Sequence, residues 1–179
     1  MAHHRTVIRH SIVALLTNAT AAGARVQGSR IEPHRKTELP AISVYTLREP
    51  IEPDSGADAP RELTRQLRVE ISLWVAINGA ATDPMDAVDD LTEQVEAVMD
   101  ANRFLDGEAG DTVLEDTEIQ VHDDRGDPLI AVATLTYVVT YRTTPGVTAT
   151  DDFLVADTTT QIGGAGDDNT ARDQVNVRE

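Results

Sequence analysis

Histidine is the first residue type in this chain that could do chemistry. His3, His4, His10 and His34 all lie in the basic N-terminal part of the sequence, and imidazole nitrogens serve as metal ligands and general bases. Neither their spacing nor the nearby acids mark a ligand set. We therefore interpret them as solvated or interface histidines and predict no metal site.

Carboxylates are the second candidate, because paired carboxylates can act as general acid and base. A helix expected over 83–100 carries Asp86, Asp89, Asp90, Glu93 and Glu96, but acids opposite an apolar stripe are typical of a solvated helix face. The serines have no evident base partner, and the sequence has no cysteine, which excludes thiol catalysis, thiolate metal sites and disulfides. We predict no catalytic residue and no cofactor, so the protein is not expected to be an enzyme.

Two short motifs have simpler interpretations than a binding site. Arg125-Gly126-Asp127 resembles an adhesion tripeptide, but it lies in a predicted hairpin turn over 123–128. Residues 163–170, GGAGDDNT, resemble a single calcium-binding nonapeptide repeat. Such repeats bind calcium when stacked in tandem, so we interpret this copy as part of a polar tail.

The bulk charge excludes one class of function. The chain has 179 residues with 15 basic and 31 acidic side chains, a net charge of −16, and non-specific DNA binding requires cations that displace counterions. No apolar run approaches the ~20 residues of a membrane span. The N-terminal apolar patch lacks a small-residue cleavage site, so we expect a cytosolic protein at synthesis.

The charge is unevenly distributed. Residues 1–48 hold seven cations and two acids, a balance of +5, and residues 49–179 hold eight cations and twenty-nine acids, a balance of −21. One interpretation is a solvated surface without further meaning. The other is that the basic part of one copy meets the acidic part of the next, a head-to-tail contact that generates rings or filaments.

A long strand is the element around which the rest is expected to fold. Residues 61–77 alternate strictly from Leu67 onward, with Leu67, Val69, Ile71, Leu73, Val75 and Ile77 on one face. We expect this strand to overhang its own sheet and to leave an unpaired edge that invites another chain.

The other expected elements are helices over 6–22 and from Asp83, and strands over 41–47, 112–122 and 129–142. They predict an α/β (α+β) fold with a mainly antiparallel sheet, an extended strand and two main helices packed on it. We place one domain at 1–144 and an acidic Thr/Asp/Gly-rich C-terminal arm at 145–179. Alone, this arm cannot bury enough apolar surface to fold, and we expect it to lie extended on a neighbour.

An ordered set of short motifs carries a family resemblance. These are VQGSR at 26–30, ELPAISVYT at 38–46, RVEI at 68–71, the Met85-Asp86 helix with VEAVM at 95–99, and TYRT at 140–143. Over residues 5–143 the chain resembles the tail terminator proteins of long-tailed phages, the minor tail protein U family. The arm after Arg142 is longer and more acidic than this resemblance leads us to expect.

The resemblance implies a structural virion protein made in the host cytoplasm. Such proteins form a hexameric ring on the head-proximal end of the tail tube, stop tube polymerisation and dock to the head-tail connector. DNA would pass through the lumen without specific binding. Our candidate inter-subunit contact residues are Arg30, Arg48 and Trp74, because Arg and Trp are enriched at interface hot spots. The alternatives are a head-tail joining (neck) or tail-tube subunit, a small cytosolic binding domain, or a metal-dependent hydrolase.

Overall fold

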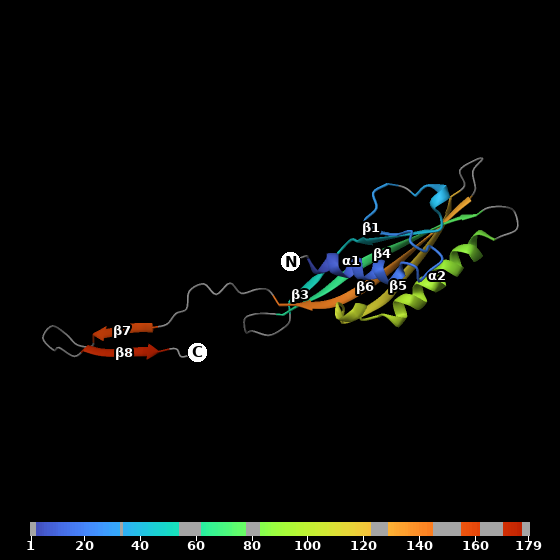
Figure 1. Cartoon of the computed structure of the whole chain (residues 1–179). Coiled ribbons are helices and arrows are strands. Elements are labelled where there is room, and N and C mark those ends of the chain that lie inside the picture. Colours follow the sequence, from blue (N-terminus) through green and yellow to red (C-terminus); the bar gives the residue numbers. More distant parts are fainter. Residues whose placement is uncertain are drawn as a thin grey trace. The chain divides into compact units, whose positions relative to one another are not determined.

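The computed structural model describes residues 3–32, 34–53, 62–77, 83–122, 129–144, 155–161 and 170–176 (Figure 1). Contacts divide the chain into two compact units, Met1–Pro145 and Gly146–Glu179. The first unit contains the helices α1 (His4–Leu16) and α2 (Pro84–Ala101) and the strands β1 (Val26–Gly28), β2 (Ala41–Thr46), β3 (Ile51–Pro53), β4 (Leu63–Ile77), β5 (Asp111–His122) and β6 (Leu129–Thr143). It also has two short 3₁₀ helices, η1 (Lys36–Glu38) and η2 (Leu105–Gly107).

The predicted α+β fold is confirmed. The first unit forms one sheet in the order β1-β2-β4-β6-β5, with β3 pairing β4 beside β2. Every pair is antiparallel except β1 with β2. No helix in the described part of the chain is long and apolar enough to span a membrane.

The prediction that the long strand overhangs its sheet is wrong. β4 pairs with β6 along its whole length, from Leu63↔Thr143 to Ile77↔Leu129. On its other side β2 covers Val69–Trp74 and β3 covers Leu63–Arg65. The strand is long because β6 is equally long, and their shared ladder pairs the backbone groups that face β6 up to both ends of the strand.

The rims of this sheet lie elsewhere. β1 and β5 stand at the two ends of the strand order, and neither pairs with a second strand in the described residues. β1 has only three residues, whereas β5 has twelve. The register of β5 against β6 shifts between Leu114 and Asp116 and skips Glu115. Bulges and charges of this kind are features by which edge strands limit unwanted pairing.

Both helices pack on one face of the sheet. α2 begins as predicted, because the Asp83 side chain accepts a hydrogen bond from the Met85 backbone N–H at 2.9 Å. α1 is shorter than predicted and ends at Leu16 instead of Ala22. Thr17, directly after the helix, is extended with φ −66 and ψ 123, and Asn18 follows with φ 60, so the helix does not continue beyond Leu16.

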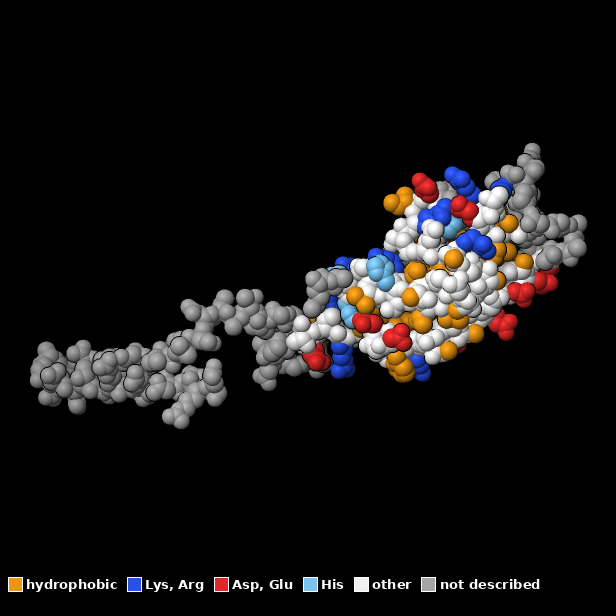
Figure 2. Space-filling model, viewed as in Figure 1, with side chains coloured by type: hydrophobic (Ala, Val, Ile, Leu, Met, Phe, Trp, Pro, Cys, Tyr) orange, Lys and Arg blue, Asp and Glu red, His pale blue; other side chains and the backbone are white. Residues whose placement is uncertain are grey.

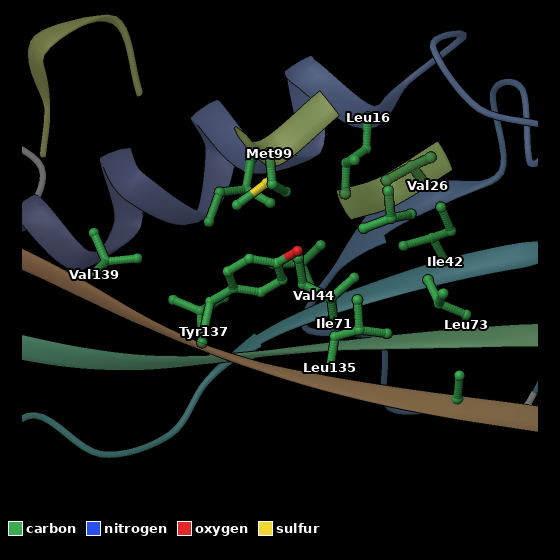
Figure 3. Close-up of a cluster of buried hydrophobic side chains, with 14 of the residues drawn as sticks. Leu16, Val26, Ile42, Val44, Ile71, Leu73, Met99, Leu135, Tyr137 and Val139 are labelled. Carbon is green, nitrogen blue, oxygen red and sulfur yellow. The ribbon is translucent and has the colours of Figure 1, made fainter. Parts of the chain in front are cut away.

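The main core lies between the helices and the sheet. Buried residues of α1, α2, β2, β4 and β6 form one cluster, in which Leu16, Met99, Ile71, Leu135 and Tyr137 meet (Figure 3). The alternation predicted for the long strand is confirmed, since Leu67, Val69, Ile71 and Leu73 are buried in this cluster. We call the opposite side of the sheet the back face.

The second unit contains an antiparallel pair of strands, β7 (Val155–Gln161) and β8 (Thr170–Asn176). The sequence analysis predicted no regular element here. The pairing runs from Val155↔Asn176 to Gln161↔Thr170, so backbone hydrogen bonds join the two strands. Isolated two-stranded hairpins are marginally stable in water.

Candidate assembly surfaces

The back face is only partly covered. The segment between β1 and β2, residues 29–32 and 34–40, lies over one half of it, and we call this segment the connector. It contacts the sheet through Ser43, where the Oγ atom lies 2.8 Å from His34 Nε2, and through Tyr45, whose hydroxyl donates to the Arg30 carbonyl at 2.9 Å.

Arg30 holds the connector together. Its guanidinium donates to the Glu32 carbonyl at 2.8 Å, to Gln27 Oε1 at 3.0 Å and to Glu38 Oε2 at 3.0 Å. Only 16% of the side chain is exposed. The bond from the Arg35 backbone N–H, followed by the nearby arginine charges, lowers the pKa of Glu38 and keeps this carboxylate ionised.

Beneath the connector, Trp74 is half-buried rather than exposed. Its ring centroid lies 5.9 Å from that of His34. Burial, followed by the charge of Arg30 and opposed by Glu38, lowers the pKa of His34. The connector therefore positions a neutral imidazole against the indole at neutral pH.

The two ends of the sheet differ in charge. Around β1 the exposed cations are Arg25 and Arg35. At the other end β5 contains four acids and no Lys or Arg, and the adjacent α2 contains six acids and no Lys or Arg. In Figure 2 blue side chains lie over the connector together with some red ones, whereas red ones follow the outer side of α2. The strand order therefore separates a basic end from an acidic end.

Among the described residues, another part of the back face is exposed and carries a row that is apolar except for Arg68. Val138 of β6 lies opposite Arg68 of β4 and Val113 of β5, and the Leu47 N–H donates to the Arg68 carbonyl at 3.0 Å. Leu47 is 64% exposed and Val113 is 54% exposed. Arg68 and Glu115 form an ion pair at 2.7 Å within this row.

A buried polar cluster lies on the helix side of the sheet. The Glu49 side chain is only 6% exposed; Arg65 Nη1 lies 2.9 Å from its carboxylate and Arg5 Nε lies 3.9 Å away. The Tyr141 hydroxyl donates to Glu49 Oε1. Burial first, and then Glu49, raises the pKa of Tyr141. The cluster ties α1, β4 and β6 to the segment between β2 and β3.

A cavity of about 470 Å³ opens beside this cluster, between His4, the 107–111 segment and the end of β6. The His4 ring packs against Tyr141 with centroids 4.4 Å apart, and His4 Nε2 lies 2.8 Å from the Glu108 carbonyl. These contacts partly bury the His4 side chain, which is 32% exposed. In the ranges that the structure describes, no group of three or more histidines and acids could hold a metal ion.

The three predicted contact residues occupy different environments. Arg48 is exposed and borders a cavity of about 140 Å³ on the back face. Arg30 is engaged inside the connector, and Trp74 lies under it. Their role between copies stays a prediction. The sequence analysis missed Ile31, which is 97% exposed; an isolated apolar residue in a polar connector was the available signal.

Several sequence interpretations lie outside the described residues. These are the turn expected at 78–82, the tripeptide at 125–127 and most of the motif at 163–170.

Comparison with known proteins gives little. No protein family matches the sequence, and no curated protein matches it. Among solved structures, a match is found to "Virion of native gene transfer agent (GTA) particle", with 13% identity and a TM-score of 0.27 over 73% of this chain and 84% of that chain. A TM-score this low does not establish a shared fold.

Proposed function

We propose that the protein is a structural virion protein, a tail terminator that forms a ring on the head-proximal end of a phage tail tube. In this role it stops tube polymerisation and offers a surface to the head-tail connector. Its function is structural rather than catalytic. The family resemblance over residues 5–143 supports the terminator role, and the arrangement of the sheet supports ring formation.

Ring formation is supported mainly by the two sheet edges, β1 and β5, which have no second strand partner among the described residues and which differ in charge. β1 and β5 are at opposite ends of one sheet, so the same contact, repeated from copy to copy, joins unlike surfaces. Such a heterologous contact closes into a ring when its rotation closes. Arg25 and Arg35 near β1 complement the acids of β5 and α2.

In this proposal the ring contact is made by the edge strands β1 and β5, and not by the strand β4 that we expected to overhang the sheet. β4 has neighbours on both sides, so it cannot provide the contact along its paired length. β5 is long enough to accept another chain, and its acids select a basic partner over a second β5 edge.

Light scattering coupled to size exclusion tests the ring. We expect a closed oligomer of the purified chain, either alone or after mixing with tail tubes. A monomer under both conditions would contradict the proposal. Hexameric order is the expectation from the family resemblance.

Electron microscopy of virions lacking this protein tests the terminator role. We expect overlong, headless tails, because tube growth then has no stop. Tails of normal length that fail only to join heads would instead favour the neck alternative, and absent tails would favour the tail-tube alternative.

A further inference from the structure

We infer that Ile31 of one copy is the apolar anchor of the ring contact and packs against the Val113–Val138 row on the back face of the next copy. This inference rests on the proposed ring. It names a contact between two specific surfaces that neither the resemblance nor the charge pattern specifies.

Ile31 is placed to reach another molecule. It follows Arg30, whose guanidinium and carbonyl are both held by hydrogen bonds, so the backbone beside Ile31 is fixed. The side chain itself is 97% exposed, the highest value among the exposed large hydrophobic residues of the described chain. A rigidly presented apolar side chain loses little conformational entropy when a partner covers it.

The position of Ile31 also fits the proposed edge contact. The connector begins directly after β1 and lies on the back face, as its contacts with Ser43 and Tyr45 show. When the β1 edge of one copy meets the β5 edge of the next, the two back faces adjoin. The first exposed apolar residue on the back face of β5 is Val113, beside half-buried Val138.

Charges around the two surfaces agree with this docking. Exposed Arg35 follows Ile31 and the exposed Glu32 in the connector. In β5 exposed Asp116 follows Val113, next to Glu115, which pairs with Arg68. Apolar anchors surrounded by complementary charges are the usual anatomy of a specific interface. A second copy of this chain is therefore the occupant of the row.

Cysteine cross-linking between two singly substituted copies tests the contact, since the natural chain has no cysteine. Ile31→Cys protein with an added tag is mixed with Val113→Cys protein under mild oxidation, and the disulfide-linked heterodimer is measured on a non-reducing gel. Mixing separate variants ensures that a mixed disulfide is intermolecular.

The matched control uses Val121→Cys in place of Val113→Cys. Val121 is 44% exposed on the same strand but lies opposite buried Ala131, on the helix side of the sheet. We expect the 31–113 heterodimer to form about tenfold or more faster than the 31–121 heterodimer, because only the first pair is held at high effective concentration. Equal rates, or faster cross-linking to position 121, would overturn the inference.

Assembly of a serine variant provides a second readout. Ile31→Ser is expected to raise the midpoint concentration for assembly about tenfold, the scale of one hot-spot side chain. Ile51→Ser, at a residue 46% exposed on β3, is expected to leave it unchanged. If the wild-type oligomer forms but neither readout depends on Ile31, the anchor is wrong and the ring stands. If the wild-type chain never oligomerises, alone or with tail tubes, both the proposed ring and the Ile31 contact are wrong.

Discussion

Some polar side chains stabilise this fold through buried contacts, although their residue type alone is more typical of a catalytic or a solvent-exposed position. Glu49 is an acid in a proline-containing segment, yet Arg65 and Tyr141 bind its nearly buried carboxylate. Removing one partner of a buried charge costs more than the bond itself contributes, because the remaining group stays desolvated. The cluster is therefore best interpreted as a structural tie rather than as a catalytic carboxylate.

Two buried tyrosines give a matched test of this interpretation. Tyr141→Phe removes a donor from Glu49 and is expected to lower the free energy of unfolding by about 1–2 kcal/mol. Tyr137 is buried as well, but its hydroxyl has no hydrogen-bond partner among the described residues. Tyr137→Phe is therefore expected to be neutral or stabilising. Urea denaturation of both variants measures the loss in free energy of unfolding. An equal loss in the two variants would contradict a stabilising role for the hydrogen bond from Tyr141 to Glu49.

His34 makes the connector sensitive to acid. Its pKa is lowered in the folded protein, so below the ordinary histidine pKa of about 6.5 the unfolded chain binds a proton that the folded chain resists. The stability that depends on neutral His34 is present above that value and is lost as the pH falls toward the folded pKa. The charges facing it are Arg30 and Glu38 of the connector.

Denaturation between pH 7.5 and 5.5 measures this effect. We expect the wild type to lose more stability over this interval than His34→Gln, which keeps a hydrogen-bonding group beside Ser43 but cannot take up the proton. His10→Gln, at an exposed histidine, is the control. Parallel pH profiles for the wild type and the His34 variant would show that the imidazole does not couple to folding.

At the scale of elements, the strands of the sheet differ in how many neighbouring strands they pair with. β4 and β6 share a fifteen-residue ladder and have neighbours on their outer sides. β1 and β5 have one described neighbour each. In the proposed ring, the edge strands rather than the longest strand would determine where another copy attaches.

Charge reversal tests the pairing of these edges. Arg25→Glu with Arg35→Glu is expected to weaken assembly at low salt, because both side chains are exposed near β1 and face acids across the proposed contact. Asp116→Arg with Glu118→Arg on β5 is expected to weaken it as well. Mixing the two reversed proteins should restore association between them, measured by light scattering. If each reversed protein remains folded but the mixture does not associate, the proposed charge pairing between the β1 and β5 edges is wrong.

At the scale of the whole molecule, charge separation would give the proposed assembly a direction. A basic end and an acidic end discourage like ends from meeting, and a repeated unlike contact leads to rings or filaments rather than to a two-fold dimer. The acidic excess also agrees with a lumen through which DNA would pass without adhering.

Salt dependence tests this directional contact. Raising the sodium chloride concentration from about 0.05 M to about 0.5 M shortens the Debye length to less than about 5 Å. We expect the midpoint concentration for assembly to rise roughly tenfold while the Ile31 contact keeps some association. Sedimentation at several protein concentrations measures the midpoint. Assembly that strengthens with salt would indicate a mainly apolar interface instead.

Local patterns in the sequence determined most of the fold. The alternation from Leu67 to Leu73 specified a strand with one buried face, and Asp83 before Pro84 specified the start of α2. These signals are local because side-chain period and helix capping depend on residues a few positions apart. We predicted α1 to be longer than it is because we did not recognise the turn at Asn18 in the sequence.

Only the tertiary structure decided which surfaces are free. The length of β4 indicated an overhang, but its partners β2, β3 and β6 come from distant parts of the sequence and cover it. For the same reason Trp74 lies under the connector, whereas the Ile31 side chain of the connector is exposed. Exposure depends on long-range pairing and packing, and single-sequence periodicity carries no information about which distant segment completes a rim.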